Sequence, residues 1–231
     1  MARGKQLQEL IAQLRAETGR NQNVAVGVSE LDNLKVQLAR VQETLYDDYD
    51  WPFLRIERSI TLNTGQRYYD FPTDLNYDRF MTIKLNRNGI YTDLERGITF
   101  DDLSIWDSND DERSSPALKW DIRNTGTSEQ IEIWSIPNED SSMQFFGTKN
   151  LSALVDDSDR ADLDDRLIVL FAASEILSRQ KSPDAQNKLN MANSRLLKLR
   201  ANSQSGSKTI QVGQGRDTKN AYSGKTVLVV R

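Results

Sequence analysis

The chain of 231 residues contains no cysteine and no histidine. The missing cysteine excludes disulfides, thiolate metal sites and a cysteine nucleophile. The missing histidine removes the commonest general base and the commonest ligand of transition metals. Enzymes that work with carboxylates alone exist, but together the two absences argue against catalysis. We therefore predict a protein that is not an enzyme and that needs neither a cofactor nor a metal.

Apolar residues and long apolar runs are also scarce. Hydrophobic residues make up 37% of the chain and charged residues 28%, which is lean for a monomer of this length and ordinary for a subunit packed between others. No stretch predicts a signal peptide or a membrane span. We expect assembly in a cytoplasm, no membrane partner, and apolar surface that is partly buried against other chains.

The charge is unevenly distributed along the sequence. The net charge is −4 at pH 7, but the last 24 residues, 208–231, contain a single acidic residue, Asp217. The chain therefore has an acidic body and a basic tail. The basic residues of the tail are Lys208, Arg216, Lys219, Lys225 and Arg231.

Apolar residues at helical spacing lie near both ends of the chain and predict two pairs of amphipathic helices. Gly19 ends the first helix, a capping box of Ser29 and Asp32 begins the second, and Ser182-Pro183 begins the last. The four stripes are Leu7, Leu10, Ile11 and Leu14; Leu31, Leu34, Leu38, Val41 and Leu45; Leu167, Leu170, Phe171, Ser174 and Leu177; and Leu189, Ala192, Leu196 and Leu199.

The middle of the chain alternates between apolar and polar residues, which predicts an antiparallel meander of about five to seven strands. Asn88-Gly89 predicts a hairpin between strands at 80–85 and 90–94. A short helix is expected at 100–106. Trp106, Trp120 and Trp134 are expected to fill the core of this β insert.

Two clusters of carboxylates, at 156–165 and 107–115, could be a metal site or an acid/base site, but neither has the accompanying residues that such a site requires. Counted from Asp157, a calcium loop would need a ligand, glycine and glutamate at positions 5, 6 and 12, where the chain has Ala161, Asp162 and Ile168. We therefore expect residues 156–165 to be a solvated linker that ends in an acidic helix N-terminus. No nucleophile or orienting base accompanies the cluster at 107–115, which predicts a mobile acidic loop.

The tail, 203–231, is rich in glycine and polar residues and ends in the most β-prone run of the chain, Thr226–Val230. We expect this run to join an edge strand of another chain, and an internal strand of the chain's own sheet stays open as the alternative. The residues predicted to bind a partner are Lys208, Arg216, Lys219, Lys225, Val227, Leu228, Val229, Val230 and Arg231.

The junction between the first helices and the β insert carries the most specific pattern. An acidic, aromatic helix end meets Trp51-Pro52, an alternating strand follows, Gly65 reverses it, and Tyr69-Asp70-Phe71-Pro72 closes the segment. With the flanking helices, this order resembles the head-to-tail adaptor, or connector, family of tailed and especially short-tailed phages over roughly residues 5–202. Tyr49, Trp51 and Phe53 are the candidate interface residues of the junction.

The resemblance implies a virion protein that forms a ring of about twelve copies, joins the portal to the tail nozzle or tube, and continues the DNA channel. Tail fibres are a further candidate partner, and DNA is expected to pass without specific binding. The family has no catalytic motif to transfer.

The predicted architecture is α+β, with N- and C-terminal helices in a helical bundle, an antiparallel β insert and an extended C-terminal arm. Another phage ring protein, such as a tube or terminator subunit, is an alternative that the helices disfavour. An envelope-degrading hydrolase would need two buried carboxylates with raised pKa in a cleft. A non-viral scaffold would differ from a ring in its native mass. The predicted boundaries are 1–50, 51–155, 156–202 and 203–231.

Overall fold

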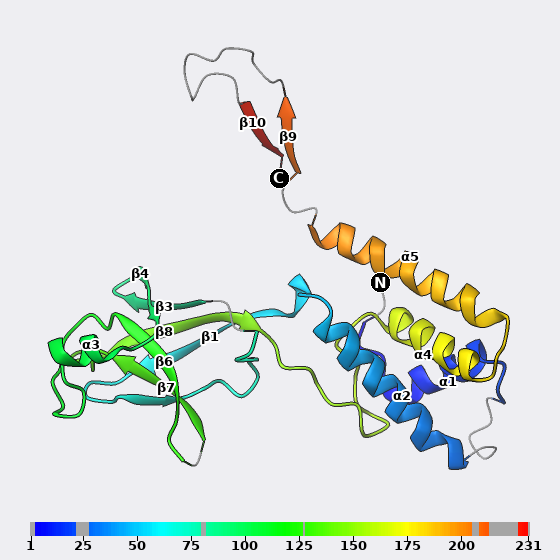
Figure 1. The fold of residues 1–231 in the computed structure, drawn as a ribbon, viewed down its shortest axis with the longest axis horizontal. Helices are drawn as coiled ribbons and strands as arrows, with labels where there is room; N and C mark the ends of the chain where they lie inside the picture. Colours follow the sequence, from blue (N-terminus) through cyan, green and yellow to red (C-terminus); the bar gives the residue numbers. More distant parts are fainter. Residues whose placement is uncertain are drawn as a thin grey trace. The chain divides into compact units, whose positions relative to one another are not determined.

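The computed structural model describes residues 3–21, 28–79, 82–126, 128–204, 208–212 and 226–230. It divides into two compact units: Met1–Pro52 with Ser152–Arg231, here called the helical unit, and Phe53–Leu151, called the β unit. Along the sequence, the β unit interrupts the helical unit between its second and third helices (Figure 1). The fold class is mixed α+β, as predicted.

The helical unit is organised around α4 (Asp165–Arg179), which packs against α1 (Leu7–Glu17), α2 (Val28–Asp47) and α5 (Asp184–Gln204). Helix α4 is apolar on almost every side, from Leu167 through Leu170 to Leu177, and a helix of this kind is stable only when neighbours surround it. The apolar stripes predicted for α1 and α2 are buried, apart from Leu31, which is half-buried.

The β unit is a sandwich of two four-stranded sheets. One sheet has the order β1-β8-β3-β4 and the other β2-β7-β6-β5. Their facing side chains, among them Trp120, Ile131 and Phe145, form one apolar core. The strands are β1 (Arg55–Leu62), β2 (Tyr68–Asp70), β3 (Thr82–Arg87), β4 (Ile90–Asp93), β5 (Glu95–Arg96), β6 (Lys119–Asn124), β7 (Glu129–Trp134) and β8 (Ser141–Thr148).

The expected meander is wrong for the insert as a whole. The consecutive strands β3–β4 and β6–β7 do pair, but β1 and β2, and likewise β7 and β8, lie in different sheets. Strand β1 pairs with β8, so Arg55 lies opposite Thr148, while β2 pairs with β7. Gly65, with a φ of +77°, turns the chain from one sheet to the other instead of forming a hairpin. The pair β5–β6 is parallel.

Two local predictions in the β unit are confirmed. Strands β3 and β4 form a hairpin at Asn88-Gly89, where both residues have a positive φ as a tight two-residue turn requires. A short helix, α3 (Phe100–Ile105), begins at the N-cap Thr99.

The three tryptophans of the β unit have different environments. Trp120 is buried in the core, and Trp134 is buried on the opposite face of β7 from Ile133, since side chains alternate along a strand. Trp106 is 38% exposed, so its predicted place in the core is wrong. At the C-terminal end, β9 (Lys208–Val212) and β10 (Thr226–Val230) pair with one another in an antiparallel sheet.

Candidate interaction surfaces

The aromatic junction at the end of α2 lies largely within the helical unit. The indole Nε1 of Trp51 donates a hydrogen bond to the carbonyl oxygen of Leu45 at 2.9 Å, and Trp51 is buried. Tyr49 meets Trp51 edge to face, with ring centroids 4.9 Å apart, and the guanidinium of Arg200 from α5 lies 5.0 Å from the centre of the Tyr49 ring. Trp51 therefore ties the end of α2 to its own unit, whereas Tyr49 and Phe53 are half-buried. Contact of these residues with another chain stays a prediction.

The acidic segment 156–165 is a folded connection with internal partners. The carboxylate of Asp159 accepts hydrogen bonds from the amides of Val155 and Asp156, at 2.8 and 2.7 Å, and these bonds lower its pKa. The carboxylate of Asp162 accepts from the amide of Ser152 at 2.7 Å. The expected solvated linker is therefore wrong for Asp159 and Asp162, because their carboxylates accept hydrogen bonds from backbone amides at the start of the segment and just before it.

The N-terminal residues run alongside this acidic segment. The amide of Leu7 donates to the carbonyl oxygen of Asp159 at 2.8 Å, and the amide of Ala161 donates to that of Lys5 at 3.2 Å. Two isolated β-bridges, Arg3 with Asp164 and Gln6 with Arg160, continue the pairing. The start of the chain is thereby joined to the start of α4.

Two adjacent buried carboxylates begin α4. Asp164 is the N-cap and accepts from the amide of Leu167 at 3.0 Å, as predicted for an acidic helix N-terminus. Asp165 accepts from the amide of Lys5 at 3.2 Å, and its second oxygen is buried without a partner among the described residues. Burial raises the pKa of Asp165. Asp165 matches the raised-pKa carboxylate expected of a hydrolase, but the neighbouring Asp164 is engaged by its cap and by Arg195.

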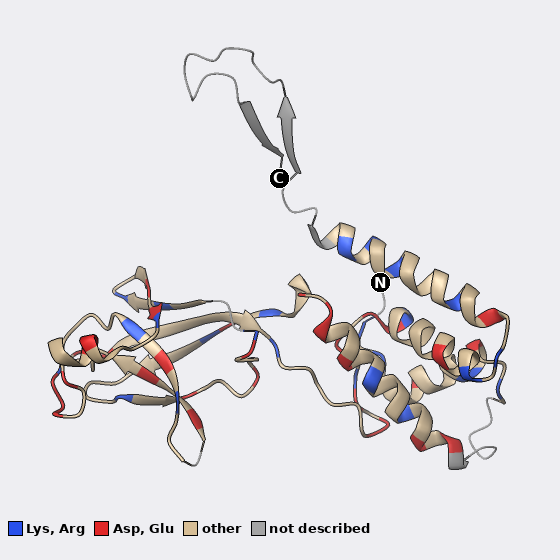
Figure 2. Cartoon of the chain, in the orientation of Figure 1, with Lys and Arg blue, Asp and Glu red and all other residues tan. Residues whose placement is uncertain are grey.

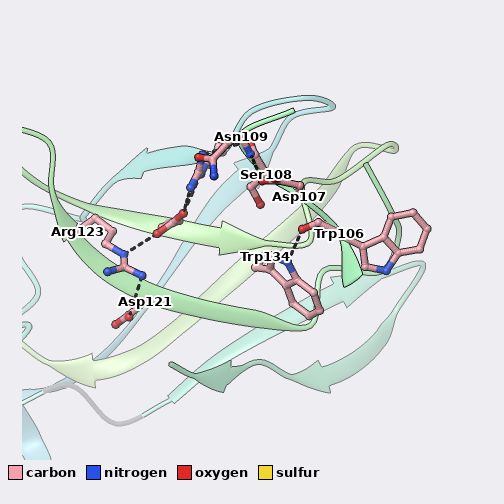
Figure 3. A network of polar contacts seen from close by, with 9 residues as sticks. Trp106, Asp107, Ser108, Asn109, Asp121, Arg123 and Trp134 are labelled. Atoms are coloured by element: carbon pink, nitrogen blue, oxygen red, sulfur yellow. Dashed lines mark hydrogen bonds and ion pairs between the residues drawn. The ribbon is translucent and has the colours of Figure 1, made fainter. Parts of the chain in front are cut away.

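A polar network covers the outer face of the sheet that contains β7 (Figure 3). The buried carboxylate of Glu132 accepts from Nε of Arg67 at 2.7 Å and from Nε of Arg123 at 2.7 Å. Arg67 also donates to the carbonyl oxygen of Ser108 and to Oδ1 of Asn109, at 3.1 and 3.0 Å. The acidic loop that follows α3 is thus attached to the sheet, in contrast to the mobile loop expected from its composition.

Helix α3 is attached to the same face. The carboxylate of Asp102 accepts from Nζ of Lys119 at 2.7 and 2.9 Å and from the amide of Thr99 at 2.8 Å. These hydrogen bonds, first that of Lys119, lower the pKa of Asp102 to about 2. The indole Nε1 of Trp134 donates to the carbonyl oxygen of Trp106 at 3.0 Å. The ribbon is coloured red at the acidic residues of α3 and of the following loop in Figure 2.

The basic tail is only partly described. Val227, Leu228, Val229 and Val230 lie in β10, and Lys208 lies in β9 opposite Val230. Arg216, Lys219, Lys225 and Arg231 lie outside the described residues. The predicted strand addition to another chain stays a prediction, and within the described part β10 pairs with β9 rather than with either sheet of the β unit.

In the described part of the chain, no group of three or more acidic side chains is arranged to hold a metal ion. Among the described residues, no helix is both long enough and apolar enough to span a membrane.

The profile of a family described as SU10 adaptor protein matches residues 5–216, which include most of the helical unit and the whole β unit. No curated protein sequence matches the chain significantly.

Proposed function

The chain belongs to the SU10 adaptor protein family of phage head-to-tail adaptors, and from this premise we propose that it is a virion structural protein that joins the portal to the tail. The observation that carries the proposal is the extent of the family match, residues 5–216, because it includes both units rather than one common element. In this role the protein continues the DNA channel from the portal into the tail nozzle or tube.

The working form of the protein is proposed to be a ring of about twelve copies, in which each copy contacts the next through two different surfaces. The exposed side of α2 supports this assembly. Val36 is 68% exposed and lies between two shallow grooves. One groove is lined by Leu34, Gln37, Ile176 and Arg179 and the other by Ala39, Leu154 and Val155. A neighbouring copy that covers Val36 and enters these grooves would bury apolar surface that one chain leaves in water.

The charge of the protein suits a ring through which DNA moves. Strong DNA binding requires dense lysine and arginine surfaces, and affinity grows with the number of phosphates that they neutralise. The chain has a net charge of −4, although residues 208–231 of the tail contain five basic residues and one acidic residue. The rest of the chain is therefore more acidic than the net charge indicates. The body of the ring therefore repels phosphate and leaves the duplex free to slide.

The tail, 203–231, is the proposed attachment to the portal. Its basic residues, Lys208, Arg216, Lys219, Lys225 and Arg231, are suited to an acidic surface, and Thr226–Val230 is suited to an open sheet edge. Lys208 and Thr226–Val230 lie in strands that pair with each other, so docking either adds this two-stranded unit to the partner or exchanges one of its strands.

The test is a measurement of native mass and rotational symmetry, on the purified protein alone and mixed with the portal. We expect a closed ring in the presence of the portal, whether or not the protein is a monomer alone. A protein that stays monomeric under both conditions and is missing from purified particles contradicts the proposal.

A further inference from the structure

Helix α3 buries a polar side chain and exposes apolar ones, the reverse of the usual pattern of a surface helix. A helix that lies on a sheet normally buries apolar residues and exposes polar ones. In α3 the residue that is buried against the sheet is Asp102, whereas Phe100 is 90% exposed and Ile105 is 63% exposed. Trp106, directly after the helix, is 38% exposed. Phe100, Ile105 and Trp106 are here called the α3 face. At about 100° per residue, Phe100 and Ile105 lie at the two edges of the exposed half of the helix, with Asp101 and Ser104 between them, and Trp106 follows at the C-cap.

This exposure belongs to a segment that is held firmly in place. Thr99 and Asp102 form a reciprocal capping box at the start of the helix, and Lys119 binds Asp102 from the sheet. At the other end, Trp134 binds the carbonyl oxygen of Trp106. The helix is attached by its polar side chains and its backbone, so the α3 face contributes little to these attachments. Rigid, exposed aromatic side chains of this kind are typical anchors of protein interfaces.

The charge around the α3 face limits what can bind there. Residues 99–116 contain six carboxylates and one basic residue. Two of the carboxylates are paired, Asp102 with Lys119 and Asp111 with Arg113, which leaves four acidic side chains without a basic partner from this stretch or from Lys119. Nucleic acid and anionic lipid are excluded by this field, because both need basic surfaces. The same α3 face on a second copy is disfavoured too, since two acidic rims would meet. The charged residues are Asp101, Asp102, Asp107, Asp110, Asp111, Glu112 and Arg113.

We propose that the α3 face binds a different protein of the virion, whose surface offers an apolar depression surrounded by lysine and arginine. This inference rests on the proposed function, in that the partner is a neighbour in the assembled particle. It adds a third contact surface, on the β unit, to the ring contacts of α2 and the attachment made by the tail. Phe100 and Ile105 supply the apolar part of the contact. Asp101, which lies between them around the helix, and Asp110 in the following loop supply its acidic part.

The experiment places the photo-crosslinking residue p-benzoylphenylalanine in the full-length chain at position 100 or 105, and at Ile90 as the control. Ile90 is 70% exposed at the tip of the β3–β4 hairpin and thus equally accessible. Purified particles that contain each variant are irradiated, and the cross-linked peptides are identified by mass spectrometry. We expect adducts from positions 100 and 105 to one segment of a different virion protein that contains lysine or arginine, with at least tenfold less adduct to that segment from position 90.

Three results overturn the proposal: no adduct from positions 100 and 105, an adduct to a second copy of this chain, or an adduct to a segment without basic residues. If the particles contain the chain but show one of these results, only this inference fails. If the particles lack the chain altogether, the proposed function fails as well.

A second measurement tests the charge and does not depend on cross-linking chemistry. The double variant Asp101→Lys and Asp110→Lys leaves the α3 face and its attachments intact and should lower the adduct yield from position 100 at least fivefold. Raising the salt concentration should also lower the adduct yield from position 100 in the chain that keeps Asp101 and Asp110. Equal adduct yields with and without the two lysine substitutions would show that the acidic residues take no part, which contradicts the proposed chemistry of the partner.

Discussion

The guanidinium of Arg195 on α5 holds the buried carboxylate of Asp164 through two nitrogens, at 2.6 Å from Nη2 to Oδ2 and 3.2 Å from Nε to Oδ1. Their hydrogen bond raises the pKa of Arg195. The same carboxylate caps α4 by accepting from the amide of Leu167. One side chain therefore joins the beginning of α4 to the middle of α5, and a single substitution should disturb both helices.

Replacing Asp164 tests how much its carboxylate contributes to the free energy of unfolding. Asp164→Ala removes a helix cap and leaves a partly buried arginine without its partner, so the free energy of unfolding should fall by about 3 kcal/mol. The control is Asp157→Ala, because Asp157 forms an exposed ion pair with Lys35 and its loss should cost about 0.5 kcal/mol or less. Urea denaturation followed by circular dichroism measures both variants. Similar losses for the two would show that burial gives Asp164 no special role.

The neighbouring carboxylate should behave in the opposite way. Burial raises the pKa of Asp165 above its ordinary value of 3.8, so in that pH range the folded chain binds the proton more tightly than the unfolded chain. Stability then falls as the pH rises through this window, and the full loss is present at pH 7. Asp165→Asn removes the buried charge and should raise the melting temperature at pH 7, with a gain that shrinks towards pH 4. Asp164→Asn is the matched control and should lower the melting temperature at pH 7.

Gly65 is needed for its backbone conformation, and the end of the flexible Arg113 side chain lies beside it. Its φ is +77°, and a Cβ there would lie 2.6 Å from Nη1 of Arg113. Gly65→Ala should lower the free energy of unfolding by about 1–2 kcal/mol or slightly more. Gly126→Ala is the control, since Gly126 has a φ of +94° and open space around it. The difference between the two variants should shrink when Arg113 is replaced by alanine; if it does not, steric contact with Arg113 is unimportant.

The ring contact proposed for α2 can be separated from folding. Val36→Glu places a charge on an exposed position, so the melting temperature of the subunit should hardly change. If Val36 is buried by a neighbouring copy, the ring should dissociate at a concentration about tenfold higher or more, equivalent to about 1.4 kcal/mol. Native mass spectrometry over a dilution series measures this. Ile90→Glu, on the β unit, is the control, and equal effects of the two would remove Val36 from the contact.

Deletion of residues 203–231 tests the tail as the attachment to the head. The truncated subunit should fold with an unchanged melting temperature, because the core residues described for both units precede the tail. Its rings should leave the head at lower salt and lower temperature, since repeated weak tails act together in a ring. A full-length variant with the five basic residues of 208–231 replaced by glutamine separates charge from strand pairing. Heads that keep their stability with the truncated protein would show that the tail is not the anchor.

Features encoded by neighbouring residues were predictable from the sequence. The helix stripe from Leu34 to Leu45 and the Asn88-Gly89 turn depend on contacts within a few residues, and the structure confirms both. Strand pairing was not predictable in this way. Arg55 pairs with Thr148 across the whole insertion, and no local signal distinguishes that partner from a nearer strand.

The acidic residues were misread for a related reason. Composition predicts that Asp159 and Asp162 are solvated, because carboxylates are usually exposed. In the structure both carboxylates accept hydrogen bonds from backbone amides. The exposure of Phe100 could not be predicted from the sequence either. An apolar residue in a short helix is normally expected to be buried, and only the structure shows that Asp102 faces the sheet in its place.

The two ends of the β unit are fastened to each other at its base. The amide of Lys149 donates to the carbonyl oxygen of Leu54 at 2.8 Å, and Arg55 and Thr148 are the first pair of the β1–β8 ladder. Entry and exit of the insertion are therefore neighbours, so a short loop can bridge residues 52 and 152 without stretching the helical unit. The β unit thereby meets the geometric requirement for removal or replacement as one piece, because its entry and exit points are adjacent.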